Sequence, residues 1–358
     1  MTLALSLVAR SPAHGHPPLG DWQLARALSS RCALTYVDPP RPVHRPSPQA
    51  TSSERDVPSA RIRPWSLPGA DRRWTAPLSD WAVTRQLDRV LPTGPRVVIV
   101  SDPRRGPLTG LRSDLTVYWR RDRFTAHEGR VRDATHLARR DRALMRESDL
   151  VLGVSPLLVE DARSLGTEAA WIPNGVDLAH FASAPLRPRD RRSGRPRVGF
   201  VGGLSWRVDV ELLDLVAVTH PEWDVVLHGP LAPGVRLPAR PNLHAHGPVD
   251  YDDLPEVMSR LDVGLVPYVD DPFNRASYPL KVFEYLAVGT PVVSTGIPAL
   301  AGLTPCVRTS DDRGGFLAAV EDVVDHGVDP STCREMASEN GWDDRAARVL
   351  ATLSEHLL

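Results

Sequence analysis

The sequence contains a single lysine, few cysteines and no long hydrophobic run. Of its 43 Lys and Arg residues only Lys281 is a lysine, and 35 of its 358 residues are proline, a bias typical of GC-rich genomes such as those of actinobacteria. The three cysteines, Cys32, Cys306 and Cys333, show no metal-ligand spacing. An odd number of cysteines fits a reducing compartment better than a disulfide scaffold.

No apolar segment approaches the ~20 residues that a membrane-spanning helix needs. The opening run Leu3–Ala9 lacks a basic leader and is followed by Arg10, so we expect a buried strand rather than a signal peptide. The net charge of -1 provides no field that would attract nucleic acid. These absences favour a cytoplasmic protein that does not bind nucleic acid.

The length suits two domains, each with its own core. Short apolar runs alternate with amphipathic stretches in both halves, which is typical of an α/β fold with a parallel, doubly wound sheet. Residues 184–197 have no hydrophobic period and are expected to form a linker. We predict an N-terminal Rossmann-like domain over 1–183, joined by a C-terminal helix over 337–358, and a C-terminal Rossmann-like domain over 198–336. Ligands bind outside the carboxyl ends of such strands, so two facing sheets would share an interdomain cleft.

The periodicity also predicts the individual elements. In the first half, strands are expected over 3–9, 33–37, 96–100, 114–118, 150–154 and 170–172, and helices over 21–30, 79–90 and 130–147. In the second half, strands are expected over 198–201, 224–227, 243–245, 263–267 and 291–294, and helices over 209–219, 253–260 and 280–288. Residues 39–72 are rich in Pro, Ser and Arg and are expected to be irregular.

Two glycines follow the first strand of the second half. Gly202 and Gly203 precede a helix that is expected to begin near Asp209. Glycine lets the backbone approach a ligand closely, and helix N-terminal amides attract anions. Arg207 stands where a guanidinium can grip a diphosphate through two hydrogen bonds. A plain turn that uses glycine for its shape explains the pattern equally well.

Residues 267–293 are the richest segment. A strand gives way to a polar loop, and Pro279 then begins a helix, a position that proline favours. The loop backbone can cradle phosphate oxygens, and Glu284, just over one turn into the helix, can accept hydrogen bonds from ribose hydroxyls. In a chain that otherwise uses arginine, the single Lys281 near Glu284 indicates a site that needs a compact ammonium group. The alternative is an exposed Lys281–Glu284 pair on an amphipathic helix.

These residues carry a resemblance to a known family. The segment 279–293 (PLKVFEYLAVGTPVV) resembles the donor-site helix of family-4-type GT-B glycosyltransferases, closest to the branch of the teichuronic acid biosynthesis transferases. Residues 172–177 (IPNGVD) with Phe181, residues 262–268 (DVGLVPY), and Trp342 with Arg345 are similar to other parts of that family. The resemblance covers nearly the whole chain and implies the GT-B architecture, with two facing Rossmann-like domains.

The resemblance also implies roles for individual residues. Glu284 would bind the donor ribose. The base would lie beside Gly247 and Val249, and the diphosphate would face Gly203 and Arg207. The phosphate would receive backbone N–H groups from Ser277, Tyr278 and Leu280, whereas Pro279 between them has none to give. One position departs from the family: its second glutamate, eight residues before Glu284, is Ala276 here. The closer branch often lacks it too, and its absence leaves the sugar contacts open.

The candidate catalytic residues lie in the N-terminal half. His14, His16 and Asp21 follow the first strand, although a loop histidine is more often a surface residue and Asp21 can simply cap a helix. Asp122 follows another strand and resembles an acidic position of the related branch. We name His16 and Asp122 as candidates. Residues 120–147 hold nine Arg against five acids, which favours a solvated helix face, or alternatively contact with a phosphorylated acceptor or an anionic membrane.

The expected reaction moves a sugar from a nucleoside diphosphate to an acceptor hydroxyl. Arg207, Lys281 and the helix amides would stabilise the departing diphosphate. The aspartates at 252–253 and 270–271 form adjacent pairs, a spacing that does not single out a metal site, so we expect no metal and no cofactor. The resemblance further implies retention of configuration, a UDP- or GDP-sugar donor, and a glycan, lipid-linked or small-molecule acceptor. Peripheral membrane contact through the N-terminal domain stays open, as do two other functions: a related enzyme, such as a nucleotide-sugar epimerase or a phosphorylase, or a catalytically silent sugar-nucleotide-binding protein.

Overall fold

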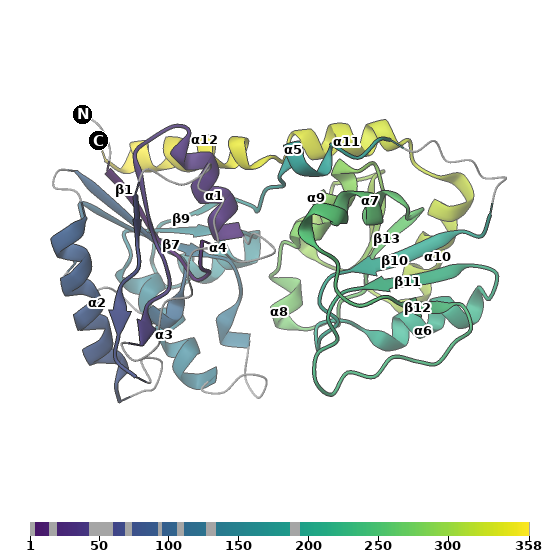
Figure 1. The fold of residues 1–358 in the computed structure, drawn as a ribbon, viewed down its shortest axis with the longest axis horizontal. Coiled ribbons are helices and arrows are strands. Elements are labelled where there is room, and N and C mark those ends of the chain that lie inside the picture. Colours follow the sequence, from purple (N-terminus) through teal and green to yellow (C-terminus); the bar gives the residue numbers. More distant parts are fainter. Residues whose placement is uncertain are drawn as a thin grey trace. The chain divides into compact units, whose positions relative to one another are not determined.

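The computed structural model describes residues 4–13, 20–42, 60–68, 74–91, 95–105, 111–126, 134–186 and 194–357. The chain divides into two compact units, Met1–Pro173 with Arg345–Leu358, and Asn174–Asp344. Each unit is built on a parallel sheet (Figure 1). In the described part of the chain, no helix is long and apolar enough to cross a membrane.

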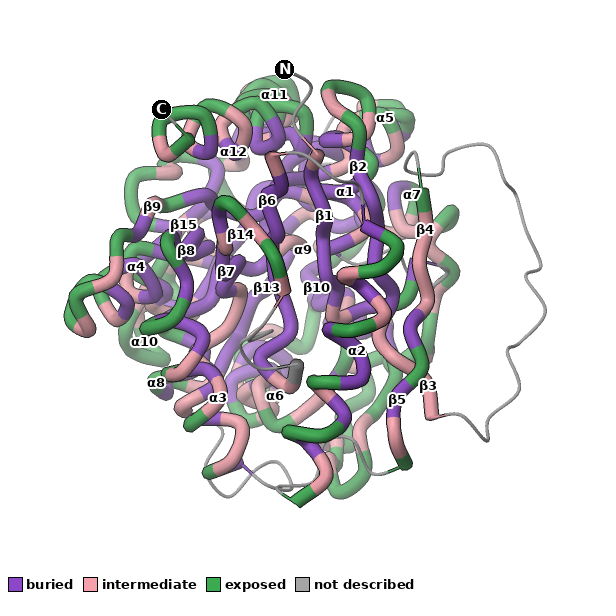
Figure 2. Tube along the Cα trace, turned by 90° about the vertical axis from the view of Figure 1, so that its left-hand side faces the viewer, coloured by how far each residue is buried: buried purple, intermediate pink, exposed green. Residues whose placement is uncertain are grey.

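The N-terminal unit has a seven-stranded sheet. Its strands lie in the order β4 (Ala60–Ile62), β2 (Leu34–Val37), β1 (Ala4–Val8), β6 (Arg96–Val100), β7 (Leu115–Arg120), β8 (Leu150–Gly153) and β9 (Ala169–Trp171). The central strands are buried along their length, as Figure 2 shows, because a parallel sheet is covered on both faces. The helices of this unit are α1 (Gly20–Ser29), α2 (Ala76–Val90), α3 (Ala134–Glu147), α4 (Pro156–Arg163) and most of α12 (Trp342–His356).

The C-terminal unit has a six-stranded sheet in the order β12 (Leu243–Ala245), β11 (Asp224–His228), β10 (Arg197–Val201), β13 (Val263–Val266), β14 (Val292–Thr295) and β15 (Val307–Ser310). Counted along the chain, this is the strand order 3-2-1-4-5-6 of nucleotide-binding doubly wound folds. The order reverses between β10 and β13, and such sheets bind ligands outside the carboxyl ends of the strands at that point. The topology therefore directs attention to the loops that follow β10 and β13.

Helices surround this second sheet. They are α5 (Leu178–Phe181), α6 (Val210–Thr219), α7 (Leu254–Ser259), α8 (Pro272–Arg275), α9 (Leu280–Ala287), α10 (Arg313–His326) and α11 (Pro330–Ser338). Short 3-10 turns lie at Pro103–Arg105, Phe124–Ala126, Tyr251–Asp253 and Pro298–Leu300. Asp209 begins α6 as expected, since its carboxylate accepts a hydrogen bond from the Leu212 N–H at 3.1 Å. The predicted α/β class with two Rossmann-like units is confirmed.

The boundary between the units differs from the predicted division into 1–183, 184–197 and 198–336 with the helix 337–358. The second unit begins at Asn174, whose side chain donates to the Tyr278 carbonyl at 2.8 Å. Val176 pairs with Gly341, and a Cβ added at Gly175 would meet the Trp342 ring at 2.9 Å, so the start of α12 also belongs there. These contacts define the boundary of the second unit. They are not accompanied by a change in amino-acid composition, so the sequence alone does not show where the boundary lies.

The segment 39–72 is not wholly irregular. Its described part contains β3 (Arg41–Pro42), which pairs with β5 (Trp65–Ser66), and β4, which joins the main sheet beside β2. Arg61 and Arg63 donate to the buried Asp38 at 2.6 and 3.3 Å, which ties β4 to the end of β2. Strands of two or three residues carry too little periodicity to be predicted. The remainder of the segment, 43–59 and 69–72, lies outside the described residues.

Candidate functional site

The turn after β10 is shaped by glycines that allow two close backbone approaches. Gly202 has a φ of +140°, and a Cβ there would lie 2.4 Å from the Lys281 Nζ. Gly229, with a φ of +141°, contacts the Gly202 carbonyl so closely that a Cβ would lie 1.9 Å from its oxygen. Gly203, by contrast, is exposed and faces open space. The glycines therefore do more than shape a turn, because they bring the backbone against the single lysine.

Lys281 lies in the first turn of α9 and is half-buried. Its Nζ lies 3.7 Å from the centroid of the Phe200 ring and 5.5 Å from that of Tyr268, which are cation–π distances. Burial lowers the pKa of the Lys281 ammonium below its usual value. The exposed surface pair considered above is therefore not what the structure shows.

The Arg207 guanidinium lies over the ring of Tyr268, the same tyrosine that Lys281 approaches. Its guanidinium is 4.5 Å from the Tyr268 ring centroid and 4.8 Å from that of Phe273, and its Nε donates to the Asn274 Oδ1 at 2.8 Å. Burial opposes ionisation of the Tyr268 hydroxyl, but the charges of Lys281 and Arg207 outweigh it and lower the pKa of Tyr268. Among the described residues, no carboxylate forms a close ion pair with either cation, and Glu284 acts on Lys281 only through its charge, so two cations face a single nearby carboxyl group.

Asn274 holds the arginine in place. This buried side chain also donates through its Nδ2 to the Val269 carbonyl at 2.9 Å, so one amide joins the loop after β13 to the turn that carries Arg207. The backbone reinforces the link, because the Val269 N–H donates to the Arg207 carbonyl at 2.8 Å. The guanidinium is therefore fixed before any ligand binds, which reduces the entropy lost on binding.

Glu284 lies one turn further along α9 and is half-buried. Burial raises the pKa of its carboxyl to about 7, although the Lys281 charge acts in the opposite direction. Within the described chain, no residue donates a hydrogen bond to this carboxylate. It is available to accept hydrogen bonds from ligand hydroxyl groups.

The start of α9 agrees with the prediction only in part. No described side chain caps this helix, and the Val282 N–H already donates to the Pro279 carbonyl at 3.2 Å, which leaves the Leu280 amide at the start of the helix without an intrahelical acceptor. Pro279 stands at the N-cap with a φ of -67°. The Ser277 N–H, however, already donates to the Asn274 carbonyl at 3.0 Å, and its hydroxyl donates to the same oxygen at 2.7 Å. Phosphate binding by the Ser277 amide would have to compete with this turn, while the Tyr278 amide stays a prediction.

The turn after β12 lies beside the glycine turn. The Gly247 carbonyl accepts from the Gly229 N–H at 2.6 Å, and Gly229 in turn contacts Gly202. Val249, two residues further on, is half-buried. The rings of His228 and His246 stack here at 4.8 Å, and the pKa of His228 is lowered by burial and by the neighbouring His246. Base binding by Gly247 and Val249 stays a prediction, but the structure does place the turn that carries them next to Gly202.

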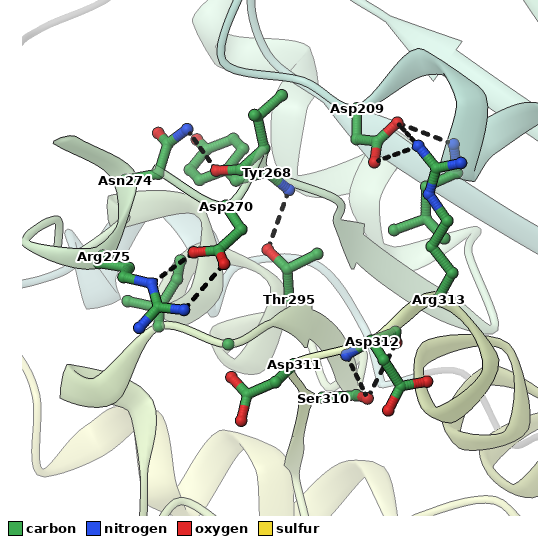
Figure 3. Close-up of a pocket in the computed structure, with 14 residues that line it drawn as sticks. Asp209, Tyr268, Asp270, Asn274, Arg275, Thr295, Ser310, Asp311, Asp312 and Arg313 are labelled. Atoms are coloured by element: carbon green, nitrogen blue, oxygen red, sulfur yellow. Dashed lines mark hydrogen bonds and ion pairs between the residues drawn. The ribbon is translucent and has the colours of Figure 1, made fainter. Parts of the chain in front are cut away.

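A hollow of about 180 Å³ lies beside the loop after β13, and its lining includes Tyr268 and Asn274 (Figure 3). It is bordered by the ends of β13, β14 and β15, and its lining includes the carboxylates of Asp209, Asp270, Asp311 and Asp312. Of the described residues that line it, two are cations, Arg275 and Arg313, and they pair with Asp270 and Asp209. The excess of carboxylates makes this hollow unsuitable for a diphosphate, in contrast to the Arg207–Lys281 cluster.

The adjacent aspartates considered as metal ligands are engaged elsewhere. Asp270 pairs with Arg275, and the Asp271 carboxylate caps α8 by accepting from the Asn274 N–H at 2.8 Å. Asp252 and Asp253 lie on the exposed turn before α7. The two pairs thus have structural or surface positions.

The catalytic candidates of the N-terminal unit are described in part. The half-buried Asp122 pairs with Arg10 at 2.9 Å. Asp21 is buried and accepts from the backbone N–H groups of Arg10 and Ser11 at 3.1 and 2.9 Å, so it fixes the loop after β1. His14 and His16 lie outside the described residues. The catalytic roles of Asp122 and His16 stay predictions.

Much of the arginine excess over 120–147 serves the interior. Arg120 is fully buried and pairs with Asp141 at 2.8 Å and with Asp161 at 2.8 Å. Arg123 also binds Asp161 at 2.5 Å. Arg139, Arg142 and Arg146 are exposed on α3 and form the solvated face that was preferred above. The charge count alone could not separate these two groups.

Four residues of the cluster were not predicted as site residues: Phe200, Tyr268, Phe273 and Asn274. Phe200 reads as an ordinary apolar residue in a strand, and Tyr268 and Asn274 lie in a loop whose path the sequence does not give. The available signals were the presence of Tyr268 in the segment 262–268 quoted for the family resemblance and that of Asn274 in the segment 267–293.

The fold defines a class of proteins. The chain is similar in structure to sucrose-phosphate synthase from Thermosynechococcus elongatus, with a TM-score of 0.73 and 16% identity over 100% of this chain and 99% of that one. It is also similar to Anabaena Alr3699/HepE in complex with UDP and glucose, with a TM-score of 0.68 and 16% identity over 99% of each chain. These similarities confirm the predicted GT-B glycosyltransferase fold.

The sequence comparisons are more specific. Residues 195–326, which lie in the C-terminal unit, match the family model of the glycosyl transferases group 1. The chain is 33% identical over 177 residues to TuaH of Bacillus subtilis (strain 168), assigned as a teichuronic acid biosynthesis glycosyltransferase, covering 46% of this chain and 44% of TuaH. It is 28% identical over 168 residues to a phosphatidyl-myo-inositol mannosyltransferase of Mycolicibacterium smegmatis, covering 44% and 41%. The matches confirm the predicted resemblance and span less than half the length of these relatives.

Proposed function

We propose that the chain is a glycosyltransferase that moves a sugar from a nucleoside diphosphate to an acceptor hydroxyl. The observation that carries this proposal is the cluster of Lys281, Arg207 and the Gly202 turn at the topological switch point of a glycosyl transferases group 1 domain. Two cations without a carboxylate partner in the described chain need an anion. A diphosphate supplies that charge, and the neighbouring Glu284 supplies an acceptor for ribose hydroxyls.

The mechanism follows from where negative charge develops. As the bond to the sugar breaks, the electrons pass to the leaving diphosphate, and the barrier falls if that charge meets fixed positive groups. Arg207 is held by Asn274 and Lys281 is enclosed by two rings, so neither has to reorganise during the reaction. The uncapped amides of α9 add the positive end of a helix.

The finer features belong to the same proposal. The chemistry assigned to Lys281 and Arg207 is what a metal ion would otherwise provide, which favours a metal-independent transferase without a cofactor. Retention of configuration, with the leaving diphosphate assisting deprotonation of the acceptor, is adopted from the family-4 resemblance. Two structures of the same fold contain UDP with glucose or UDP-2-fluoro glucose, which makes UDP the first donor nucleotide to test and GDP the second. Asp122 and His16 stay the candidate catalytic residues. Polysaccharide assembly and the decoration of a secondary metabolite remain the two settings we propose, in a cytoplasmic protein of an actinobacterial type.

Thermal melting with UDP, GDP, dTDP and ADP tests the donor site. A ligand at ~100 times its dissociation constant adds ~2.7 kcal/mol to the state that it binds, which corresponds to a rise of several degrees in Tm. We expect one nucleotide to raise the Tm of the wild type and Glu284→Ala to abolish that rise. Glu335→Ala, an exposed glutamate on α11 of the same unit, is the matched control and should respond like the wild type.

Product analysis then separates the alternatives. A transferase consumes the nucleotide sugar with an acceptor, or hydrolyses it slowly without one. An epimerase converts the nucleotide sugar without an acceptor, and a silent binding protein binds the donor without turnover. If none of the four nucleotides changes the Tm of the wild type, the assignment of the donor site is wrong.

A further inference from the structure

The N-terminal unit exposes large apolar side chains along one side of α2. Trp74 is 84% exposed, Leu78 57% and Trp81 57%, and Arg85 and Arg89 are exposed beyond them. We call these five residues the α2 surface. In Figure 2, stretches of α2 in the colour of exposed residues alternate with stretches in the colour of buried ones. Exposed tryptophan at this level is unusual on a protein surface that nothing covers.

The α2 surface is a single stripe. Leu78, Trp81, Arg85 and Arg89 are separated by three or four residues, so they fall within an arc of about 80° at about 100° per residue. Trp74 precedes Leu78 by four residues. The buried residues of the helix lie outside this arc and pack against the unit: Ala76, Ser79, Ala82, Val83, Thr84 and Leu87. The stripe is therefore not part of the core packing.

The charge on this stripe has one sign. The two acidic residues of α2 are half-buried and form ion pairs within the unit. Asp80 pairs with Arg140, and Asp88 pairs with Arg96 at 3.2 Å. Arg85 and Arg89 are the exposed charged residues of the helix, and the Arg85 guanidinium lies 5.8 Å from the Trp81 ring centroid. Trp65, 47% exposed on β5, adds a further aromatic ring, since the Gln86 side chain binds its backbone at 2.9 and 3.0 Å.

We infer that the α2 surface docks on an anionic lipid membrane. Tryptophan partitions to the interface between headgroups and acyl chains, and arginine pairs with anionic headgroups while its stem covers apolar surface. A second copy of the chain is a poorer occupant. A two-fold contact through this stripe would bring the guanidinium groups of Arg85 and Arg89 from both copies into one interface, in which the stripe offers no carboxylate to pair with them. The inference does not depend on the proposed transferase activity.

Flotation of the full-length protein with lipid vesicles tests this inference. We expect binding to phosphatidylcholine vesicles that contain phosphatidylglycerol, and little binding to phosphatidylcholine alone. Arg85→Glu/Arg89→Glu reverses two surface charges and should weaken binding to the anionic vesicles at least about tenfold. Added salt should weaken vesicle binding by the wild type. Trp74→Ala/Trp81→Ala should weaken it similarly. All four side chains are exposed, so the variants should keep the wild-type Tm.

Two controls make the result specific. Arg139→Glu/Arg142→Glu reverses exposed charges on α3, the other arginine-rich helix, and Trp171→Ala removes an exposed tryptophan that is not on α2. Both should float like the wild type. Vesicle binding that survives both α2 variants, or that is lost equally in the α3 variant, overturns the inference. So does a dimer in sedimentation that Trp74→Ala/Trp81→Ala abolishes, in a protein that binds no vesicles.

Discussion

At the scale of single residues, Lys281 shows how composition can point to a site. Arginine occupies every other basic position, yet the space around the Lys281 Nζ is bounded by the Phe200 ring at 3.7 Å and by the backbone of Gly202. A planar guanidinium with five donors is larger than an ammonium group and needs room for its fork. The enclosure explains why arginine does not replace lysine here.

We therefore expect Lys281→Arg to lose donor binding although it keeps the positive charge. A hydrogen bond to a charged group contributes about 1.5–3 kcal/mol, so the loss of affinity for the preferred nucleotide should be roughly ten- to hundredfold. Calorimetric titration measures it, with Lys281→Met as the comparison that removes the charge. Equal losses in the two variants support the steric explanation, whereas an arginine variant within about threefold of the wild type contradicts it.

Glu284 predicts a pH dependence with a defined sign. Its pKa is raised to about 7 by burial, and in the proposed donor complex ribose hydroxyls would donate to the ionised carboxylate. Binding should therefore release a proton, and the affinity for a nucleotide sugar should fall as the pH decreases through about 7. Between pH 8 and pH 6 the expected loss is about tenfold by linkage. A nucleotide sugar is the proper ligand because its diphosphate is esterified at both ends and does not titrate in this range.

Glu284→Gln is the control for this dependence. It should bind more weakly than the wild type at pH 8, with an affinity that is constant between pH 6 and pH 8. The pH dependence of the stability of the free protein has the opposite sign to that of nucleotide-sugar binding. A raised carboxyl pKa favours the folded state below the unfolded value, and this contribution is lost as the pH rises through about 7. Glu284→Gln should therefore match or exceed the wild-type Tm at pH 8, and a parallel pH profile in both proteins would refute the assignment.

At the scale of elements, the two turn glycines form a matched pair. A Cβ at Gly202 meets Lys281 at 2.4 Å and requires a φ of +140°, whereas a Cβ at Gly203 meets nothing within 4 Å. Gly202→Ala should lower the Tm and abolish the nucleotide response, because both the backbone and Lys281 must move. Gly203→Ala should keep the Tm of the free protein and still weaken the nucleotide response if a diphosphate occupies the open space.

Melting curves with and without the nucleotide decide between the outcomes. Equal loss of Tm in the two free variants would mean that the turn is not shaped as described. A full nucleotide response in Gly203→Ala would place the diphosphate elsewhere. The two substitutions add the same methyl group one residue apart, so differences in composition or unfolded-state entropy are small.

The elements also show what a sequence can and cannot predict. The long apolar strands β6 and β10 and the helices α2 and α9 were predicted because their patterns are local, whereas strand β15 and the helices α4, α10 and α11 were not predicted. Strands β3 to β5 were missed, since their pairing depends on Asp38 and on contacts distant in the chain. In the site, the family motif indicated Lys281 and Glu284. It could not show that Asn274 fixes Arg207 or that the Ser277 N–H already has an acceptor, because these are properties of loop conformation.

At the scale of the whole molecule, the two units have separate sheets and carry different surfaces. The unpaired cations and the glycine turn lie in Asn174–Asp344, while the α2 surface and the candidates Asp122 and His16 lie in the N-terminal unit. The family model covers residues 195–326, which are contained in the C-terminal unit. The proposed donor site and the proposed membrane surface thus lie in different units. Binding of a nucleotide sugar should therefore stabilise the C-terminal unit first.

Hydrogen exchange with and without the preferred nucleotide sugar tests this division. A ligand slows exchange in the segments whose opening it opposes, so the largest protection should fall in residues 200–207 and 277–284 of the C-terminal unit. Residues 76–90, which form α2, should exchange at the same rate in both conditions. Glu284→Ala under identical conditions should show no protection at the ligand concentration used for the wild type. Protection confined to the N-terminal unit would assign donor binding to the other sheet and would leave the Lys281–Arg207 cluster without its proposed ligand.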